Sequence, residues 1–245
     1  MTTKVSIILA TYNECENIQR VILQTIETLG LRLEEIIVID DDSPDKTAER
    51  VRDISDPRVR LVVRKTPSES NTAGMKPRLA SAIVCGIELA KSDVIGWMDA
   101  DLSHPPKLLT NLLSEIDKGV NVAIASRFVR GGADKRSAIV VFCSYLINNF
   151  ARTVLMSPIK DQTSGYVLVR KKVFHDFALS PVGHGEYFIE FLHKARIHGN
   201  TMTEVGYTFR ERSTGSSKTY KNFVQYLRFG FVYGVRVISL RVKRV

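Results

Sequence analysis

Residues 94–106 have the sequence VIGWMDADLSHPP. It begins as a short apolar run typical of a buried strand, places Asp99 and Asp101 directly after that run, and enters a helical pattern at Pro106. Two carboxylates separated by one residue can hold a hard divalent cation, and they can equally cap the helix that follows. The stretch therefore predicts a strand, a polar turn and a helix in succession, with candidate metal ligands in the turn.

The same succession recurs on both sides of this stretch. Strands are predicted at 5–10, 35–40, 59–64, 94–98 and 120–126, and helices at 16–29, 45–54, 79–90 and 106–118. Such alternation is typical of βαβ units that form a mainly parallel sheet with helices on both faces. Ligands of these α/β folds bind beyond the carboxyl ends of the strands. We therefore look for function in the turns at that edge.

Polar residues follow the first two predicted strands. Tyr12 and Glu14 come after the first strand, and three consecutive carboxylates, Asp40, Asp41 and Asp42, come at the end of the second. Three like charges are costly unless a cation or a ligand rich in donors compensates them. A carboxylate here can accept hydrogen bonds from a nucleobase, and Tyr12 offers a stacking face. A solvated loop that caps the next helix explains the same residues, and both interpretations stay open.

The second half of the chain is less regular. We predict a basic, glycine-containing loop at 127–136, an apolar helix at 139–156, a polar turn at 161–165 and a Ser/Gly-rich loop at 212–217. Strands at 166–169 and 202–209 flank a helix at 186–198. The five histidines show no metal-ligand spacing, and none receives a role. The three cysteines are widely spaced and favour a reducing compartment over a disulfide framework.

Positive charge is concentrated at one end of the chain. The 35 Lys and Arg exceed the 26 Asp and Glu by nine, and residues 207–245 hold nine basic residues against one acidic, which is +8 of that +9. This segment predicts contact with a polyanion such as nucleic acid, a phosphorylated ligand or anionic lipid. Residues 221–245 form a helical pattern with a broad apolar face and a basic side that holds Lys221, Arg228, Arg236 and Lys243. It fits a membrane-surface helix or a helix packed on the protein's own core.

Several motifs together carry a family resemblance. They are ATYNE at 10–14, IDDDSPDKT at 39–47, MDADLSHPP at 98–106, Ser126-Arg127 with Gly131-Gly132, Asp161 with Thr163-Ser164-Gly165, Glu204-Val205, and RSTGSSK at 212–218. In this order they resemble inverting GT-A glycosyltransferases, in particular the polyprenyl-phosphate (dolichyl-phosphate) mannosyltransferase family. The resemblance implies a GT-A, Rossmann-like α/β fold and a nucleotide-sugar donor.

The resemblance also implies roles for the residues at the donor side. The residues that bind the nucleotide sugar would be Ala10, Tyr12, Glu14, Asp41, Asp99 and Asp101. A Mg²⁺ or Mn²⁺ ion would be held at Asp99, Asp101 and Ser103, although some relatives carry Gln in place of this serine. Asp42 and Lys46 occupy positions where the family commonly has glycine.

At the acceptor side the resemblance points to basic residues. A lipid phosphate monoester is already anionic near neutral pH, so it needs orientation and charge compensation more than deprotonation. The residues implied to bind this phosphate are Arg127, Arg136, Arg212 and Lys218, and the catalytic set is Asp101, Arg127, Arg212 and Lys218. Guanidinium groups suit this task because they bind phosphate oxygens in pairs.

The sequence thus predicts a metal-dependent, inverting transfer of mannose from GDP-mannose to a polyprenyl phosphate such as dolichyl phosphate, with UDP-glucose as the alternative donor. We expect one catalytic domain over 1–220, with a donor half at 1–126 and an acceptor half at 127–220, and a membrane-surface helix at 221–245. The expected location is peripheral, on the cytoplasmic side of a membrane, with or without a membrane-spanning partner subunit.

Two other classes of protein fit the sequence less well. A non-catalytic protein could use the basic end of the chain to bind nucleic acid or a membrane, but the apolar face of 221–245 interrupts the cations and disfavours nucleic acid. A dinucleotide oxidoreductase would need Gly-x-Gly-x-x-Gly after the first strand, where this chain has residues 11–14, TYNE.

Overall fold

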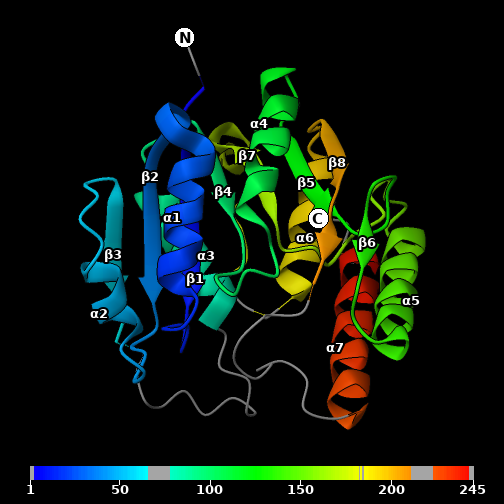
Figure 1. Ribbon diagram of the computed structural model, residues 1–245. Helices are drawn as coiled ribbons and strands as arrows, with labels where there is room; N and C mark the ends of the chain where they lie inside the picture. The colour runs from blue at the N-terminus through cyan, green and yellow to red at the C-terminus, as the bar shows by residue number, and fades with distance from the viewer. Residues whose placement is uncertain (1–2, 66–77, 182, 184, 211–222, 243–245) are drawn as a thin grey trace.

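The computed structural model describes residues 3–65, 78–181, 183, 185–210 and 223–242. Its centre is a seven-stranded sheet in the order β3-β2-β1-β4-β7-β5-β8 (Figure 1). The strands of this sheet are β1 (Val5–Thr11), β2 (Leu33–Asp40), β3 (Val59–Val63), β4 (Val94–Trp97), β5 (Val122–Ser126), β7 (Val167–Arg170) and β8 (Met202–Gly206). A parallel pair lies apart from it, β6 (Ala133–Asp134) with β9 (Thr208–Phe209).

Helices cover both faces of the sheet. They are α1 (Ile18–Leu29), α2 (Thr47–Arg52), α3 (Arg78–Leu89), α4 (Leu109–Asp117), α5 (Ala138–Val154), α6 (Glu186–Ile197) and α7 (Phe223–Val242), with 3-10 turns η1 (Gly30–Arg32), η2 (Pro106–Leu108) and η3 (Lys171–His175). The apolar faces of α1 and α4 pack in one buried cluster, and those of α3 and α6 pack in another. The predicted α/β fold is therefore confirmed.

The structure departs from the predicted strands near residue 206. One strand was predicted over 202–209, but β8 pairs with β5 only as far as Gly206, and β9 pairs with β6. A side chain at Gly206 would lie 2.4 Å from the carbonyl oxygen of Arg130, so only glycine lets these two backbones approach. The close approach draws the loop at 127–136 against β8 and β9, and β6 forms inside that loop.

Two helices, α5 and α7, lie side by side at one flank of the molecule (Figure 1). Their facing sides share a buried cluster that includes Ala151, Leu155 and Val237. Arg236 pairs with Glu190 of α6, which also receives Lys194 at 2.9 Å. Arg236, which the sequence places on the basic side of the last helix, therefore faces a carboxylate of the neighbouring helix while 34% of its side chain stays exposed. The structure describes the backbone of this helix over 223–242. The side chains of 221–229 and 243–245, which include the predicted basic residues Lys221, Arg228 and Lys243, lie outside the described part.

Two turn residues adopt the left-handed backbone conformation that favours glycine. Asp42 has a φ of 53° and Lys46 a φ of 70°, and these are the two positions where the family commonly has glycine. A residue with a Cβ is strained in this region by roughly 1–2 kcal/mol, whereas glycine is not. The left-handed conformation at these two positions is one that glycine adopts without strain, and this chain holds it with larger residues.

This strain predicts the effect of replacing Lys46. Lys46→Gly should unfold with a free energy about 1 kcal/mol higher than Lys46→Ala, because both variants lose the lysine charge and only glycine relieves the backbone. Urea unfolding followed by circular dichroism measures the difference. Equal stability of the two variants would contradict the left-handed conformation at this position.

Candidate active site

The turns after β1 and β2 form one connected surface. Three backbone amides of the first turn donate to side chains of the second: Asn13 to Ser43 Oγ at 2.9 Å, Glu14 to Thr47 Oγ1 at 2.9 Å and Cys15 to Asp45 Oδ2 at 3.0 Å. Because the amide groups are satisfied by side chains of the opposite turn, the two turns hold one another in place. Ala10 and Tyr12, predicted to contact the nucleotide, lie on the rim of this surface, half-buried and exposed respectively.

The three consecutive aspartates have three different environments. Asp40 is fully buried and accepts three hydrogen bonds from neighbouring hydroxyl and amide groups. Asp41 is buried against Arg64, whose Nε lies 2.8 Å from Oδ1. Asp42 is exposed. The charge repulsion that the sequence suggested is therefore relieved within the protein, and Asp41 is the member of the triplet whose position is fixed by an ion pair.

The turn after β4 brings the predicted metal ligands to the same edge. Asp99 is half-exposed, with 48% of its side chain accessible, whereas Asp101 is buried. Asp101 Oδ1 accepts hydrogen bonds from the backbone amide and the hydroxyl of Ser103 at 3.0 and 2.5 Å. Leu102 between them has a φ of 66°. Ser103 thus fixes the orientation of Asp101.

His104 is buried under this turn and accepts a hydrogen bond from its backbone, a role that the sequence did not reveal. Its side chain is 1% exposed and stacks on Tyr166, with ring centroids 5.0 Å apart. Its Nδ1 accepts the backbone amide of Asp99 at 3.0 Å, so the ring is neutral with its proton on Nε2. Burial lowers the pKa of His104 to about 4. A histidine flanked by a strand-end carboxylate pair and two prolines was the available signal.

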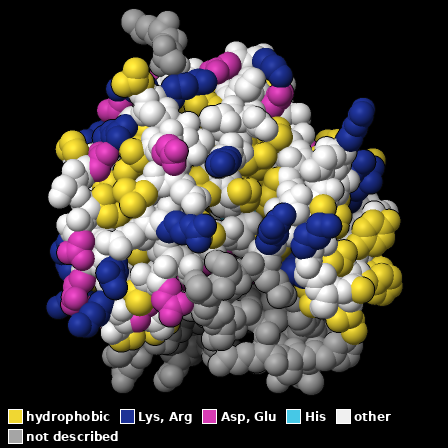
Figure 2. Space-filling model, in the orientation of Figure 1, with side chains coloured by type: hydrophobic (Ala, Val, Ile, Leu, Met, Phe, Trp, Pro, Cys, Tyr) yellow, Lys and Arg dark blue, Asp and Glu magenta, His cyan; other side chains and the backbone are white. Residues whose placement is uncertain are grey.

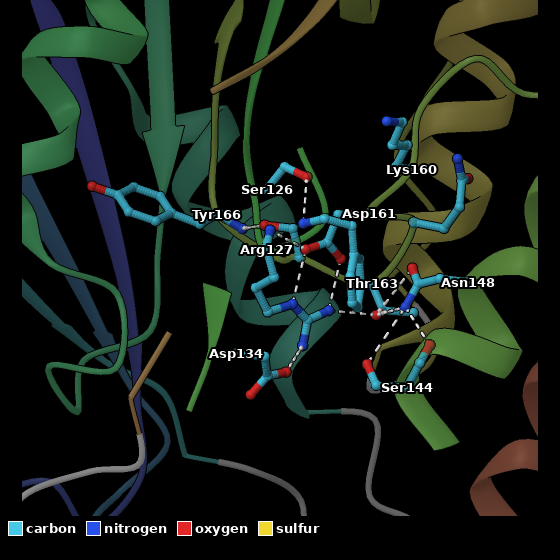
Figure 3. Close-up of polar contacts among 12 residues, drawn as sticks. Ser126, Arg127, Asp134, Ser144, Asn148, Lys160, Asp161, Thr163 and Tyr166 are labelled. Atoms are coloured by element: carbon cyan, nitrogen blue, oxygen red, sulfur yellow. Dashed lines mark hydrogen bonds and ion pairs between the residues drawn. The ribbon is translucent and has the colours of Figure 1, made fainter. Parts of the chain in front are cut away.

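Arg127, predicted to bind phosphate, lies at the end of β5 and is buried (Figure 3). Its Nε and Nη2 donate to Asp161 at 2.8 and 2.7 Å, and its backbone amide donates to the same carboxylate at 2.9 Å. Nη2 also donates to Thr163 at 2.9 Å. Burial acts to lower the pKa of Arg127, but the Asp161 carboxylate outweighs it and raises that pKa. The guanidinium is therefore largely committed to internal partners.

A second carboxylate joins Arg127 to Arg136. Asp134 Oδ1 accepts a hydrogen bond from Nε of Arg136 at 2.9 Å, and Asp134 Oδ2 lies 3.6 Å from Nη1 of Arg127. The ring of Phe209 sits beside both cations, with centroid distances of 5.7 Å to Arg127 and 4.8 Å to Arg136. Desolvation works against ionisation of Asp134, yet the bonds from Arg136 lower its pKa overall. Asp134 was not singled out from the sequence; a carboxylate two residues before an arginine in a basic loop was its only signal.

Two further motif residues hold this arrangement together. Glu204 on β8 accepts the backbone amides of Lys160 and Asp161 at 2.8 and 3.0 Å. Gly132 lies so close to the backbone of β5 that a side chain there would come within 2.6 Å of the carbonyl oxygen of Ser126. The motif segments around 126, 132, 161 and 204, distant in sequence, therefore converge on Arg127. The predicted Arg212 and Lys218 lie outside the described residues.

The carboxylates after β4 fit a divalent cation in part. Asp99 and Asp101 are hard oxygen ligands at the carboxyl edge, which suits Mg²⁺ or Mn²⁺ bound jointly with phosphate oxygens of a ligand. Among the described residues no group of three or more His, Cys, Asp or Glu side chains is arranged to hold a metal ion. The residues present therefore fit an ion whose coordination is completed by substrate and water.

Residues 6–177 match the family model described as glycosyl transferase family 2. The chain belongs to this family. The matched segment contains both turns of the donor edge, the Asp99 turn, and Arg127 with Asp134, Asp161 and Thr163, whereas Glu204 and Phe209 lie beyond it.

Two curated relatives are similar over most of the chain. A dolichol-phosphate mannosyltransferase of Pyrococcus furiosus is 34% identical over 230 residues, which are 92% of this chain and 62% of that protein. A polyprenol monophosphomannose synthase of Mycolicibacterium smegmatis is 32% identical over 224 residues, 89% of this chain and 81% of that protein. This family 2 chain therefore spans about three fifths of the length of the first relative and four fifths of the second.

Solved structures confirm the GT-A fold. Glucosyl-3-phosphoglycerate synthase from Mycobacterium tuberculosis, crystallised with Mn²⁺, UDP and glucosyl-3-phosphoglycerate, superposes with a TM-score of 0.69 at 16% identity and covers 98% of this chain and 80% of that one. The same enzyme with Mg²⁺ and UDP gives a TM-score of 0.68 at 16% identity, covering 98% and 79%. At this identity the likeness shows a shared fold.

The ion pair at Arg127 predicts a large effect on stability. Arg127→Met should lower the free energy of unfolding by about 3–5 kcal/mol, because it leaves the buried Asp161 carboxylate without its cation. Adding Asp161→Asn to that variant should recover part of the loss, because the uncompensated charge disappears. Chemical denaturation of the three proteins measures both effects.

Arg130→Met is the matched control, because Arg130 is exposed in the same loop. Its free energy of unfolding should change by less than about 0.5 kcal/mol. Equal destabilisation by the Arg127 and Arg130 substitutions would refute the structural role assigned to the buried pair.

Proposed function

We propose that this chain transfers mannose from GDP-mannose to a polyprenyl phosphate such as dolichyl phosphate, with inversion at the anomeric carbon. One observation carries the proposal: a carboxylate pair at the end of β4 and an arginine network at the end of β5 lie at the same sheet edge in a family 2 chain. The names of the two relatives, dolichol-phosphate mannosyltransferase and polyprenol monophosphomannose synthase, support mannose as the transferred sugar and a polyprenyl phosphate as the acceptor.

The reaction needs no general base in this proposal. An oxygen of the lipid phosphate, already ionised near neutral pH, attacks the anomeric carbon as the bond from that carbon to the donor's diphosphate oxygen breaks. The phosphate monoester becomes a phosphodiester, and the nucleoside diphosphate leaves with the bonding electrons. The protein's task is to align the two anions and to compensate their charge.

The described residues divide between donor and acceptor. In our proposal Tyr12, Glu14 and Asp41 hold the nucleoside, and Asp99 and Asp101 face its diphosphate. Asp99 and Asp101 would also hold a Mg²⁺ or Mn²⁺ ion, which when bound compensates the charge of the departing diphosphate. Ser103 stays in the proposed metal set, and its buried hydroxyl also donates a hydrogen bond that orients Asp101. The neighbouring structures with Mn²⁺ or Mg²⁺ and UDP support a divalent ion in this fold.

The arginines differ in what they can offer an acceptor. Arg127 is 5% exposed and is held by Asp161 and Thr163, whereas Arg136 is 13% exposed and its guanidinium donates to one carboxylate among the described residues, Asp134. We propose that Arg136 contacts the acceptor phosphate and that Arg127 sets the position of this loop. Arg212 and Lys218 stay in the proposed acceptor set on the strength of their motif.

The acceptor's lipid chain implies a surface that meets a membrane. Large apolar side chains are exposed on α5 and α7, namely Ile139, Phe142, Tyr145, Leu146 and Phe150 on α5, and Phe231, Val235, Ile238 and Val242 on α7. Figure 2 shows hydrophobic side chains at the flank where α5 lies, with Lys and Arg side chains nearby. In the described part of the chain, no helix has the length and apolar character needed to span a membrane. We propose that the outer faces of α5 and α7 rest on the lipid surface.

A donor panel tests the reaction. The protein is incubated with radiolabelled GDP-mannose or UDP-glucose and phytanyl or dolichyl phosphate in the presence of Mn²⁺ or Mg²⁺. We expect a lipid-linked product with GDP-mannose, none after chelation with EDTA, and at least 100-fold less product from Asp101→Asn, because that substitution removes a proposed ligand of the divalent ion that compensates the charge of the diphosphate.

Asp53→Asn removes an exposed carboxylate at the end of α2 and should transfer mannose like the wild type. Product formed only with UDP-glucose would show that UDP-glucose, and not GDP-mannose, is the donor. The absence of a lipid-linked product with either donor would overturn the proposed reaction.

Vesicle flotation tests the membrane surface. Phe142→Glu should lower binding to vesicles containing anionic lipid about 10-fold or more, because it replaces a large apolar contact with a charge. Leu31→Glu is the matched control: Leu31 is 94% exposed but lies in η1, away from α5 and α7. Equal loss of binding in both variants would argue against a specific docking face.

A further inference from the structure

Helix α5 has an outer and an inner face with different chemistry. Its outer face carries the exposed apolar side chains described above, and its inner face carries Ser144, Asn148, Ala151 and Leu155 at helical spacing. Asn148 is 2% exposed and is the one amide side chain of α5 that is buried. A buried amide needs partners, and where those partners lie shows what the helix is attached to.

The amide of Asn148 connects α5 to the loop at 157–165. Its Nδ2 donates to the carbonyl oxygen of Ser144 at 2.7 Å and to Thr163 Oγ1 at 3.0 Å. The same Thr163 oxygen accepts Nη2 of Arg127 at 2.9 Å. Figure 3 shows this chain of contacts from Ser144 and Asn148 through Thr163 to Arg127. One hydroxyl therefore lies between the inner face of α5 and the guanidinium of Arg127.

Arg136, the second arginine of this cluster, is connected to α5 through the backbone. Arg136 precedes the first residue of α5, Ala138, by two positions, and its side chain is held by Asp134. Arg127 and Arg136 are thus both tied to this helix, one by hydrogen bonds and one by the chain. Asp134 and the ring of Phe209 contact both cations, so the two arginines form one packed unit that is connected to α5 at both of its ends.

We propose that Asn148 is a positioning residue: through Thr163 it fixes Arg127 relative to Arg136, so that seating α5 on a lipid surface sets the width of the acceptor-phosphate site. This inference rests on the proposed function. It assigns to the buried face of α5 a task in acceptor recognition that is separate from the hydrophobic contact of its outer face.

Other charged groups do not substitute for this link. In the described part of the chain, Arg127 forms ion pairs with Asp161 and Asp134, and neither of these carboxylates belongs to α5. Asp161 is held by Glu204 of β8 through its backbone amide. Among the described residues, the hydrogen bonds between Thr163 and Asn148 are therefore the side-chain polar contact that joins α5 to the Arg127 cluster.

The test compares Asn148→Leu and Thr163→Val with Thr163→Ser, which keeps the hydroxyl. The wild type and variants are assayed with GDP-mannose, Mn²⁺ and dolichyl phosphate in vesicles, and KM is measured for each substrate. Asn148→Leu and Thr163→Val should raise the KM for dolichyl phosphate about 10-fold, the scale of one hydrogen bond in a charged network, and leave the KM for GDP-mannose within 2-fold. Thr163→Ser should behave like the wild type.

Asn149→Ala is the matched control on α5, because Asn149 is exposed and bonds only to Tyr145 among the described residues. If Asn148→Leu does not fold, as judged by circular dichroism, Thr163→Val gives the same reading with a substitution that keeps the side-chain shape.

The outcomes separate this inference from the proposed function. A wild type that transfers no mannose would overturn both. An active wild type with unchanged acceptor KM in Asn148→Leu or Thr163→Val would overturn the positioning role alone. A parallel rise of both KM values, or a rise also in Asn149→Ala, would show a general loss of structure and would likewise overturn it.

Discussion

The buried pair between Arg127 and Asp161 is the interaction on which the acceptor half depends. Neither charge could be buried alone, because the desolvation of an unpaired ion in a protein interior costs several kcal/mol. The pair is therefore stable only while β5, the turn at 161–165 and β8 stay together, since Glu204 of β8 holds the backbone of Asp161. This dependence joins three motif segments that are distant in the sequence into a single structural unit.

The donor half is organised by a different constraint, the satisfaction of backbone amides at the ends of parallel strands. Side chains of the β2 turn accept the amides of the β1 turn, and neutral His104 accepts the amide of Asp99. These bonds leave the carboxylate of Asp99 half-exposed at the sheet edge. The site thus combines an acidic donor side, suited to a cation and a diphosphate, with a basic acceptor side whose arginines are already partly neutralised.

The sequence predicted the alternating strands and helices because hydrophobic periodicity is local, and it predicted Asp99, Asp101 and Arg127 because they belong to motifs. It could not predict partners. The division of the aspartate triplet into Asp40, Asp41 and Asp42 with separate roles depends on Arg64 and on tertiary contacts. The inward direction of Arg236 likewise depends on Glu190 of a neighbouring helix, which no helical wheel of one segment contains. The left-handed backbone conformation at Lys46 could not be predicted from its residue type. The sequence showed only that a lysine stands where the resemblance implies glycine.

In our proposal one sheet edge holds a nucleotide-sugar diphosphate at Asp99 and Asp101 and a lipid phosphate beside the arginine pair. A crystal structure of the protein with GDP, Mn²⁺ and phytanyl phosphate tests it most directly, because phosphorus and manganese positions are visible in the same map. The account predicts Mn²⁺ bound at Asp99 and Asp101 and the lipid phosphate within hydrogen-bond distance of Arg136. A lipid phosphate bound away from the loop at 127–136, or GDP bound away from the Asp99 turn, would contradict it.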